Sequence, residues 1–511
     1  MAQTEVLVAG AGPTGLNLAL WLTRLGVSVR IVDTSEGPGE TSRAIAVQAR
    51  TLEFYRQLGF AAEAVQRGTI ANSIRVRLRG TEAGELDFGD RGDAVHAQSP
   101  YAYVLILPQD EHERMLVERL HEAGVEVERG TELLEYDDLG NGIRAVLNGP
   151  GGVRETVEAA YLCGCDGAHS SVRRRMGVGF PGGTYDRLFY VADVRGSGGG
   201  LDGRLNFCVD ANSFCIALPL RHGQSTRLIG SVIQSVGDDR QLEFAAVAPE
   251  AAALTGGSFA GVDWFSTYRA HHRVADAFRK GNAFLLGDAA HIHSPAGGQG
   301  MNTGIGDAAN VAWKIAAVLA RRAEPALLDT YESERIPFAR SLVATTDRLF
   351  ASAVGDSLFD RFLRTVLVPR IVPELLNVEA VRLRWFDAIS QTRIRYRTSA
   401  LSEGAAGKIR GGDRLPWVDG PGGGNFAALA SLDWQIHVYG KAETALREAA
   451  ARHGIALHEF APSEAAIRVR LEEDALYLVR PDGHVGLAQP DQDVVPLERY
   501  VTRLGIAGRD A

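Results

Sequence analysis

The most constraining feature of this chain is the glycine pattern GAGPTG at residues 10–15. An apolar run at residues 6–8 precedes it and indicates a buried strand, and the residues after it are typical of a helix. In such a turn, Gly10 permits the sharp bend, Gly12 lets the backbone approach a pyrophosphate, and Gly15 lets the helix pack on the strand. The helix N-terminus then presents free N–H groups and a partial positive charge to the phosphates. The pattern predicts a βαβ unit that binds a dinucleotide.

An acidic residue completes the dinucleotide pattern. Residues 27–32 indicate a second buried strand, and Asp33 follows at its end, where a carboxylate can accept hydrogen bonds from an adenosine ribose. The alternative is a glycine-rich turn that binds nothing. The strand, the helix and the acid all stand in the order that a dinucleotide site requires, which argues against that alternative.

Three further turns follow or precede predicted elements. A buried strand at residues 283–286 leads into the sequence GDAAH, in which Asp288 can hold a ribityl hydroxyl. The sequence PAGGQGMN at residues 295–302 precedes a helix and can present backbone N–H groups to a planar, electron-rich edge. The sequence CDGAHSSVR, which begins at Cys165, places an Asp-Gly turn after a strand. Each turn alone is common, but the four in this order are far more specific.

Composition excludes several classes of protein. The 511 residues suggest two to four domains, and 45% hydrophobic with 23% charged residues is typical of a soluble globular chain. A formal net charge of -9 without a basic stripe argues against a nucleic-acid partner. No apolar run reaches the roughly 18 residues that a membrane helix needs, and no signal peptide is expected. Four cysteines are too few for a disulfide scaffold, so a cytoplasmic protein is expected.

The chain divides by pattern into several parts. From about residue 188 to 236, short β-prone segments alternate with turns, which suggests an antiparallel sheet domain inserted into the nucleotide-binding domain. Residues 404–424 are rich in Gly, Asp and Pro and are predicted to be a linker. Beyond them, strands at 434–439 and 475–479 and a helix at 442–452 predict a small α/β unit.

Together the motifs carry a family resemblance. They comprise GAGPTG, CDGAHSSVR, the run GDAAHIHSPAGGQGMNTGIGDAANVAWKI from Gly287, Arg43 with RTLE at 50–53, and YESERIP at 331–337. Over nearly its whole length the chain resembles the flavoprotein monooxygenases related to para-hydroxybenzoate hydroxylase, especially the branch acting on phenols and aromatic polyketides. The resemblance implies an α/β fold with a Rossmann-type FAD-binding domain, an inserted antiparallel β-sheet substrate domain and a C-terminal thioredoxin-like α/β domain.

The resemblance also implies domain bounds and site residues. The bounds are 1–75, 109–180 and 276–400 for the FAD-binding domain with its connecting helices, 76–108 and 181–275 for the substrate domain, and 401–511 for the C-terminal domain. The residues implied to bind FAD are Gly10, Gly12, Pro13, Thr14, Gly15, Asp33, Arg43, Gln109, Asp166, Gly167, Asp288, Pro295, Gly300, Met301 and Asn302. The catalytic positions implied beside the flavin ring are Pro295, Gly298 and Asn302.

The chemistry that the resemblance implies is oxygen transfer. NADPH or NADH reduces FAD, dioxygen adds at the flavin C4a atom, and the hydroperoxide delivers an oxygen to a phenolic or polycyclic aromatic ring, in a site that excludes water. The expected partners are the small aromatic or polyketide substrate and dioxygen, with the enzyme a monomer or homodimer. A Baeyer–Villiger, epoxidising or antibiotic-modifying oxygenase on the same fold and a non-catalytic flavin-binding scaffold are the alternatives.

Related flavoprotein classes lack support in the sequence. No second GxGxxG pattern follows a strand, which argues against flavoproteins with a separate nicotinamide domain. The Trp-x-Trp-x-Ile-Pro signature of flavin halogenases is absent. The C-terminal segment resembles the thioredoxin-like tail of the phenol and polyketide hydroxylases, with RPDGHV at residues 480–485 as its most familiar piece. It contains no cysteine, so it cannot exchange disulfides.

The substrate pocket is the least constrained part of the prediction. An alignment with the benzoate hydroxylase places Leu205 and Phe207 where that enzyme grips a carboxylate, with Cys215 facing them from the next segment. Leu205 and Phe207 share strand parity and would point to one apolar face, which cannot pair a carboxylate. The equally weighted alternative is that these residues are simply core.

One pair of histidines and one pair of cysteines have spacings that suggest a metal or redox site, but simpler explanations account for both. His291 and His293 have metal-like spacing, but only Asp288 lies near them in sequence and the flavin prediction already uses it, so no metal is expected. Cys163 and Cys165 flank a strand end and are predicted to be buried structural thiols.

Overall fold

The apolar N-terminal strand, β1 (Ala2–Ala9), lies inside an eight-stranded sheet. The computed structural model describes residues 2–39, 44–88, 95, 98–210, 213–232, 242–293, 298–354 and 378–508. The sheet has the order β17 (Arg279–Lys280), β18 (Ala283–Leu285), β11 (Arg154–Gly164), β1, β2 (Val29–Val32) and β8 (Val127–Glu128), with β10 (Ile143–Asn148) and β9 (Glu132–Asp138) attached beside β11. β18, β11, β1, β2 and β8 run parallel, as a βαβ unit requires.

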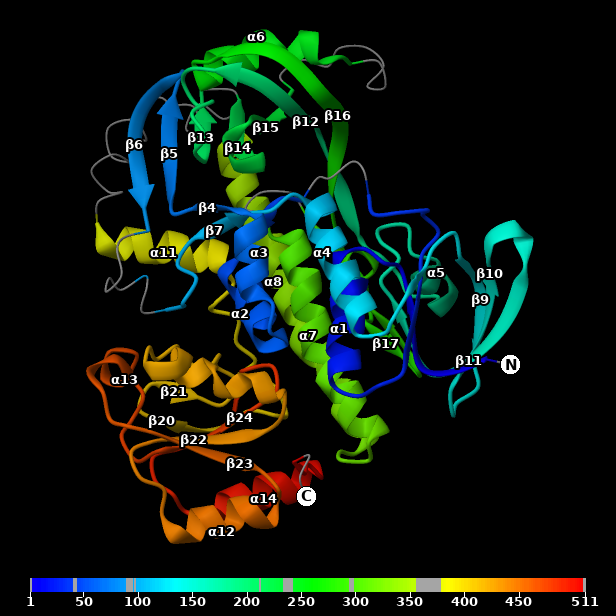
Figure 1. Ribbon diagram of the computed structural model, residues 1–511, viewed down its shortest axis with the longest axis vertical. Coiled ribbons are helices and arrows are strands. Elements are labelled where there is room, and N and C mark those ends of the chain that lie inside the picture. The colour runs from blue at the N-terminus through cyan, green and yellow to red at the C-terminus, as the bar shows by residue number, and fades with distance from the viewer. Residues whose placement is uncertain are drawn as a thin grey trace.

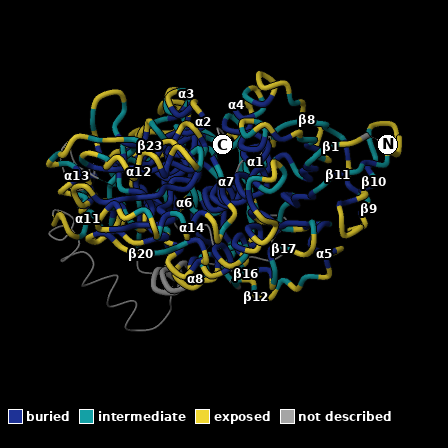
Figure 2. The backbone as a smooth tube through the Cα atoms, turned by 90° about the horizontal axis from the view of Figure 1, so that it is seen from below, coloured by how far each residue is buried: buried dark blue, intermediate teal, exposed yellow. Residues whose placement is uncertain are grey.

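Helices cover this sheet, and the hydrophobic core contains residues of both. α1 (Pro13–Arg24) packs against α4 (Gln109–Glu122) and α7 (Gly300–Leu319), and Figure 2 shows buried backbone concentrated where α1 and α7 lie. α7 begins at Gly300, inside the sequence PAGGQGMN that is expected to precede a helix. A Cβ at Gly304 would lie 2.2 Å from the Thr14 hydroxyl oxygen, so the close packing of α7 on α1 requires glycine there.

The second sheet also has eight strands and is mostly antiparallel (Figure 1). Its order is β19 (His291–Ile292), β16 (Ser258–Val274), β12 (Gly182–Ser197), β15 (Ser225–Ser231), β14 (Phe214–Leu220), β13 (Asn206–Val209), β5 (Ser73–Leu78) and β6 (Thr81–Asp87). One face packs on α6 (Phe244–Thr255) through an apolar cluster that includes Tyr190 and Cys215. The other face packs toward the first sheet's domain, where Leu205 joins a second cluster.

Short elements link the two sheets. A three-stranded sheet contains β3 (Ala46–Val47), β7 (Val104–Ile106) and β4 (Thr69–Ala71), and beside it lie α2 (Ala49–Leu58) and α3 (Ala61–Arg67). Two more helices, α8 (Asp329–Val354) and α11 (Glu379–Ser390), follow α7, and α5 (Ser171–Met176) follows β11. No helix within the described ranges is long and apolar enough to span a membrane.

The prediction that residues 404–424 form a linker is wrong. This segment contains most of β20 (Glu403–Ala406) and all of β21 (Ile409–Arg410), and Leu415 and Trp417 within it are buried. Its glycines allow tight packing instead of flexibility. Gly404 has φ +73°, and a Cβ there would lie 2.1 Å from a neighbouring backbone oxygen.

The C-terminal residues form a third sheet that packs on the first domain. Its order is β21, β20, β25 (Val485–Gln489), β24 (Leu476–Val479), β22 (Gln435–Tyr439) and β23 (Ala456–Phe460), with helices α12 (Thr444–Arg452), α13 (Glu464–Arg468) and α14 (Val494–Leu504). Trp313 of α7 meets Trp434 edge to face, with ring centroids 5.6 Å apart. This unit is therefore joined to α7 by a shared apolar core.

Candidate flavin site

The turns that follow four neighbouring strands meet at one edge of the first sheet. β18, β11, β1 and β2 are consecutive neighbours and run parallel, so their carboxyl ends lie side by side. Gly10 follows β1 and Asp33 follows β2, while Asp166 and Asp288 lie two and three residues after β11 and β18. Such an edge is where parallel α/β sheets bind ligands.

The three glycines of the first turn have different structural reasons. Gly10 has φ +103°, and a Cβ there would lie 2.3 Å from the Cys165 backbone oxygen. A Cβ at Gly15 would lie 1.9 Å from the Gly10 oxygen. A Cβ at Gly12 would meet nothing within 4 Å. The open space at Gly12, in front of the N-terminus of α1, fits a pyrophosphate.

Asp33 supports this turn as well as facing the ligand edge. Its Oδ2 accepts the Ala11 N–H at 2.6 Å, and its Oδ1 accepts the Ser35 N–H at 2.8 Å. The Ser35 hydroxyl also donates to Oδ1, which leaves Oδ2, with one of its two lone pairs used, as the oxygen that can still accept a ribose hydroxyl. The bond to Ala11 means that Asp33 also fixes the conformation of the glycine turn.

The Asp-Gly turn after β11 carries a carboxylate, and only one of its two oxygens accepts hydrogen bonds from the described residues. Asp166 Oδ2 accepts the N–H groups of Ser171 and Val172 at 2.7 and 3.2 Å, capping α5. Its Oδ1 is buried without a hydrogen-bond partner among the described residues. Gly167 has φ +75° and keeps this turn tight. A buried carboxylate oxygen without a donor fits a ligand that supplies a hydroxyl or amide.

Arg173 connects two of the turns and does not point to the ligand edge. Its guanidinium donates to the backbone oxygens of Ala168 and Ala289, both at 2.9 Å, and lies 3.9 Å from the centre of the Phe180 ring. These contacts join the Asp-Gly turn to the turn that contains Asp288. Its role is to hold the two turns together.

Asp288 is exposed in a short 3-10 turn, Gly287–Ala289, that a buried carboxylate holds in place. Asp307 of α7 accepts the Gly287 N–H at 3.0 Å, His291 Nε2 at 2.7 Å and Arg335 Nε at 2.5 Å. Burial would raise the pKa of Asp307, but Arg335 and His291 hold it below its ordinary value. Thr14 packs on Gly287, which brings the GAGPTG and GDAAH motifs into contact.

The N-terminus of α7 supplies backbone donors at the same place. α7 begins at Gly300, so the N–H groups of Gly300, Met301 and Asn302 belong to its first turn, where helix N–H groups lack intrahelical partners. The Asn302 side chain is fully used by the protein. Its Oδ1 accepts from Gln48 N and Thr51 Oγ1, and its Nδ2 donates to the backbone oxygens of Ala46 and Gly298.

Gln109 lies at the periphery of the site. Its Oε1 accepts the Ala44 N–H at 3.4 Å, and its Nε2 donates to Glu113 at 2.7 Å. Glu113 accepts the Gly39 N–H at 2.9 Å, and burial raises the pKa of its carboxyl. Gln109 and Glu113 thus hold both ends of the segment that contains Arg43. Arg43 and Pro295 themselves lie outside the described residues.

The structure brings two of the three expected substrate residues together and separates the third. Phe207 pairs with Ile216 and Cys208 pairs with Cys215 between β13 and β14, so Phe207 and Cys215 lie on opposite faces. The expectation that Cys215 faces Leu205 and Phe207 is therefore wrong. Cys215 belongs to the core under α6, whereas Phe207 stacks on Phe214 with centroids 6.3 Å apart. The register of the two strands, which the sequence does not reveal, decides the face.

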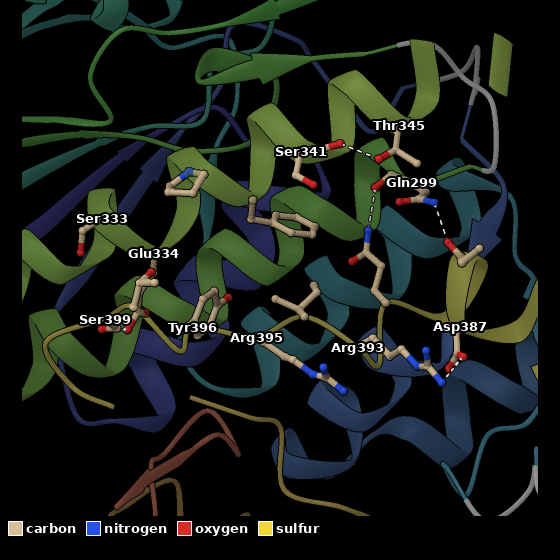
Figure 3. Close-up of a pocket in the computed structure, with 16 residues that line it drawn as sticks. Gln299, Ser333, Glu334, Ser341, Thr345, Asp387, Arg393, Arg395, Tyr396 and Ser399 are labelled. Carbon is tan, nitrogen blue, oxygen red and sulfur yellow. Dashed lines mark hydrogen bonds and ion pairs between the residues drawn. The ribbon is translucent and has the colours of Figure 1, made fainter. Parts of the chain in front are cut away.

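Two cavities border the described residues, one beside the start of α7 and one at the second sheet. One, of about 520 Å³, is bordered by α8, α11 and residues 391–399, and among the described residues it reaches the site through Gln299 at the start of α7 (Figure 3). The Gln299 side chain donates to the Ala388 oxygen at 2.8 Å, which ties α11 to that turn. The other, of about 610 Å³, borders Leu205 and has Asn72, Glu85 and Arg204 on its walls.

Other candidate groups are accounted for by packing. Cys163 and Cys165 are buried free thiols, and burial raises the pKa of both. His291 is engaged by Asp307. The described part of the chain holds no group of three or more histidine, cysteine, aspartate or glutamate side chains arranged to hold a metal ion.

The comparisons with known proteins agree with this geometry. A family model described as FAD binding domain matches residues 3–346. The chain is 37% identical to 6-methylpretetramide 4-monooxygenase of Streptomyces rimosus, over 79% of this chain and 72% of that protein. It is 34% identical to pentachlorophenol 4-monooxygenase of Sphingobium chlorophenolicum, over 69% of this chain and 66% of that protein.

Similarity extends to the three-dimensional structure. The OxyS anhydrotetracycline hydroxylase from Streptomyces rimosus superimposes with a TM-score of 0.76 at 26% identity, over 99% of this chain and 100% of that one. The family model covers more than half of the chain, and the first relative exceeds 30% identity over most of it. The resemblance that the motifs carry is thus confirmed. The chain belongs to the FAD binding domain family and is an FAD-dependent aromatic hydroxylase.

Proposed function

We propose that this enzyme binds FAD across the edge formed by the turns after β1, β2, β11 and β18, and uses NADPH or NADH with dioxygen to hydroxylate a phenolic or polycyclic aromatic compound. The observation that carries the proposal is the meeting of these four turns at one edge, with open space at Gly12. The relatives named for a pretetramide and for pentachlorophenol support an aromatic substrate.

The residues of the edge have distinct proposed roles. The backbone at Gly12 and the first turn of α1, with Pro13 and Thr14, would hold the pyrophosphate. Asp33 would hold the adenosine ribose and Asp288 the ribityl chain, each by charge-assisted hydrogen bonds. Asp166 would accept a hydrogen bond through its spare oxygen. Bound FAD would supply the electron transfer and the activation of dioxygen.

The helix α7 has the proposed task of orienting the ring. Gly300, Met301 and Asn302 would direct backbone N–H groups at the pyrimidine edge, where the positive end of a 20-residue helix stabilises negative charge. Asn302 acts through its backbone, because its side chain holds Gln48 and Thr51 in place. Pro295 and Gly298 complete the proposed catalytic turn. Arg43 is proposed to contact the pyrophosphate.

The second sheet is proposed to receive the substrate. Its face toward the first domain carries Phe207, Phe214 and Ile216, an apolar surface suited to a bulky aromatic and unable to pair a benzoate carboxylate. We assign residues 76–108 and 181–275 to this substrate domain, and 401–511 to a thioredoxin-like unit without redox chemistry. The assembly is proposed to be a monomer or homodimer in the cytoplasm.

A panel of phenols and aromatic polyketides tests the function. The purified protein should be yellow with non-covalent FAD, and a true substrate should raise NADPH or NADH consumption and yield a product that contains one added oxygen. Product structure by NMR separates ring hydroxylation from Baeyer–Villiger insertion or epoxidation. Measured hydrogen peroxide reports uncoupled turnover. Failure of every panel member to stimulate nicotinamide oxidation would favour a non-catalytic flavin scaffold.

A further inference from the structure

A charged hairpin of the C-terminal sheet is buried against the FAD-binding part of the chain. It connects β24 to β25, and its residues Arg480, Asp482 and His484 are 0%, 1% and 2% exposed. Two side chains of α2 hold it from the other side. Arg50 donates to the Asp482 backbone oxygen at 2.6 Å, and Gln57 donates to the Pro481 oxygen at 3.0 Å.

Arg480 completes the pairing of a buried glutamate on α8. Its two terminal nitrogens donate to the carboxylate of Glu334 at 2.7 and 3.0 Å, and it also pairs with Asp482 at 2.7 Å. Glu334 accepts further bonds from Lys314 at 2.8 Å and Ser399 at 2.6 Å. Charges buried to this degree are tolerated only when each has its partners, so the cluster is complete only with the hairpin in place.

The next residue on α8 faces the flavin edge. Arg335 donates from Nη1 to the Tyr396 hydroxyl at 2.9 Å, from Nη2 to the Thr303 backbone oxygen at 3.0 Å, and from Nε to Asp307. The Tyr396 ring lies 4.5 Å from the ring of His484 in the hairpin. Figure 3 shows Tyr396 close to Glu334 and Ser399. Glu334 contacts the hairpin and the next residue, Arg335, contacts the flavin edge, so neighbouring residues of α8 contact both.

Asp307 ends this series of contacts at the flavin edge. It holds the Gly287 N–H and His291, on either side of Asp288, while Arg335 also holds Thr303 in the first turns of α7. Tyr396 therefore joins the hairpin cluster to the Arg335–Asp307 pair inside the protein, through ring packing on His484 and a hydrogen bond from Arg335. Buried polar networks of this kind reinforce each member's geometry.

We propose that the hairpin Arg480–His484 is a positioning element for the flavin-binding turn, acting through Tyr396 and Arg335 on Asp307. The inference rests on the proposed placement of FAD at the turns that contain Gly12 and Asp288. Among the described contacts, the hairpin reaches the flavin edge through Tyr396 and Arg335. The C-terminal domain thus contributes to cofactor binding through a network that is complete only when the domain is docked.

The test uses two variants of the network and one matched control in the full-length protein. Tyr396→Phe removes the hydroxyl that Arg335 uses but keeps the ring on His484, and Arg480→Lys removes the paired contact with Glu334. Each is expected to raise the FAD dissociation constant, measured by flavin fluorescence on the deflavinated protein, by about fivefold. The control, Leu446→Ala, weakens the buried core of the C-terminal unit outside the network and should leave that constant unchanged while lowering the melting temperature.

The double variant distinguishes coupling from general damage. If Arg480 acts through Tyr396, its substitution should have a smaller effect on FAD binding in the Tyr396→Phe background, and the two effects should not add. Dissociation constants within twofold of wild type for both network variants would overturn the proposal, as would an equal rise in the Leu446→Ala control. Loss of FAD in Gly12→Val alongside either result shows that the cofactor site is placed correctly and that only the coupling fails.

Discussion

At the scale of single residues, the same residue type has unrelated roles within one short turn. Gly10 and Gly15 are required by the protein's own backbone, since a Cβ at either position would clash with a backbone oxygen. Gly12 is not required by the fold, because a Cβ there meets open space. The ligand, and not the protein, therefore explains why a side chain would be harmful at Gly12.

Gly12→Val should weaken FAD binding and leave the fold intact. The side chain would occupy the space of the pyrophosphate, and we expect the FAD affinity to fall by at least roughly tenfold, about 1.4 kcal/mol or more. FAD content after purification and the melting temperature of the apoprotein measure the two effects. Gly15→Ala is the contrast, since it should destabilise the apoprotein itself. Wild-type FAD affinity in Gly12→Val would show that the dinucleotide assignment is wrong.

At the scale of elements, strand register decides which side chains the substrate meets. Phe207 and Ile216 share one face of the β13 and β14 pair, and Cys208 and Cys215 share the other. A shift of one residue would exchange the two sets. The apolar face toward the first domain is therefore a property of the pairing, not of either strand alone.

Phe207→Arg should impair turnover of a bulky phenol. A cation on this apolar face lacks a partner, and we expect kcat/KM to fall by at least about tenfold. Cys215→Ser, on the opposite face, should lower stability while leaving KM unchanged. Steady-state kinetics with the best panel substrate measures both. Efficient turnover of para-hydroxybenzoate by the wild type would contradict this assignment of the substrate face.

Buried charges on α7 and α8 should make the stability of the protein depend on pH in a predictable direction. Burial would raise the pKa of Glu334, but Arg480 and Lys314 hold it well below its ordinary value of 4.5. A depressed carboxyl pKa contributes stability that is present above the unfolded pKa and lost as the pH falls through the folded one. Stability should therefore decrease as the pH drops below about 4.5.

Glu334→Gln should separate this contribution from general acid unfolding. At neutral pH the variant should lose about 3–5 kcal/mol, because Lys314 would lose its charged partner and Arg480 would keep only Asp482. Below about pH 4.5 its stability should depend less on pH than that of the wild type. Urea unfolding across this pH range measures both. Glu498→Gln, in an exposed pair with Arg452, is the control and should change little. Parallel acid profiles for wild type and Glu334→Gln would contradict the assignment.

At the scale of the whole molecule, the C-terminal unit is part of the core and not a tethered appendage. Trp313 of α7 packs with Trp434 and Tyr500 in one apolar cluster, and Arg480 pairs with Glu334 of α8. Both an apolar and a charged interface would be exposed if the unit were removed. We therefore expect the two parts to unfold together.

Removal of residues 404–511 should yield a chain that aggregates or binds FAD weakly. The truncation exposes Trp313 and leaves Glu334 and Lys314 without Arg480 and Asp482. Soluble yield and FAD content report the outcome. Replacing Glu334 with Gln and Lys314 with Met in the truncated chain should recover part of the soluble yield, since it removes the buried charges. A soluble truncation with wild-type FAD affinity would contradict this account.

The sequence by itself determined the local elements and the kind of cofactor. The glycine turn, the apolar strand before it and the helix after it are encoded within a few residues, and α1 lies where the pattern predicts it, at Pro13–Arg24. Turn residues and apolar periods are local properties, so they can be interpreted without knowing the rest of the fold. The order of the four motifs along the chain was enough to indicate a flavin enzyme.

Only the tertiary structure decided which side chains work together. The Asn302 and Arg173 side chains form hydrogen bonds within the protein. Cys215 lies on the face of its sheet opposite Phe207, and the glycine-rich segment after Glu403 forms strands. The tertiary structure also joined Arg480 to Asp307 through partners far apart in sequence. Strand register and the pairing of buried charges depend on long-range packing, and no local pattern records which distant residue will be the partner.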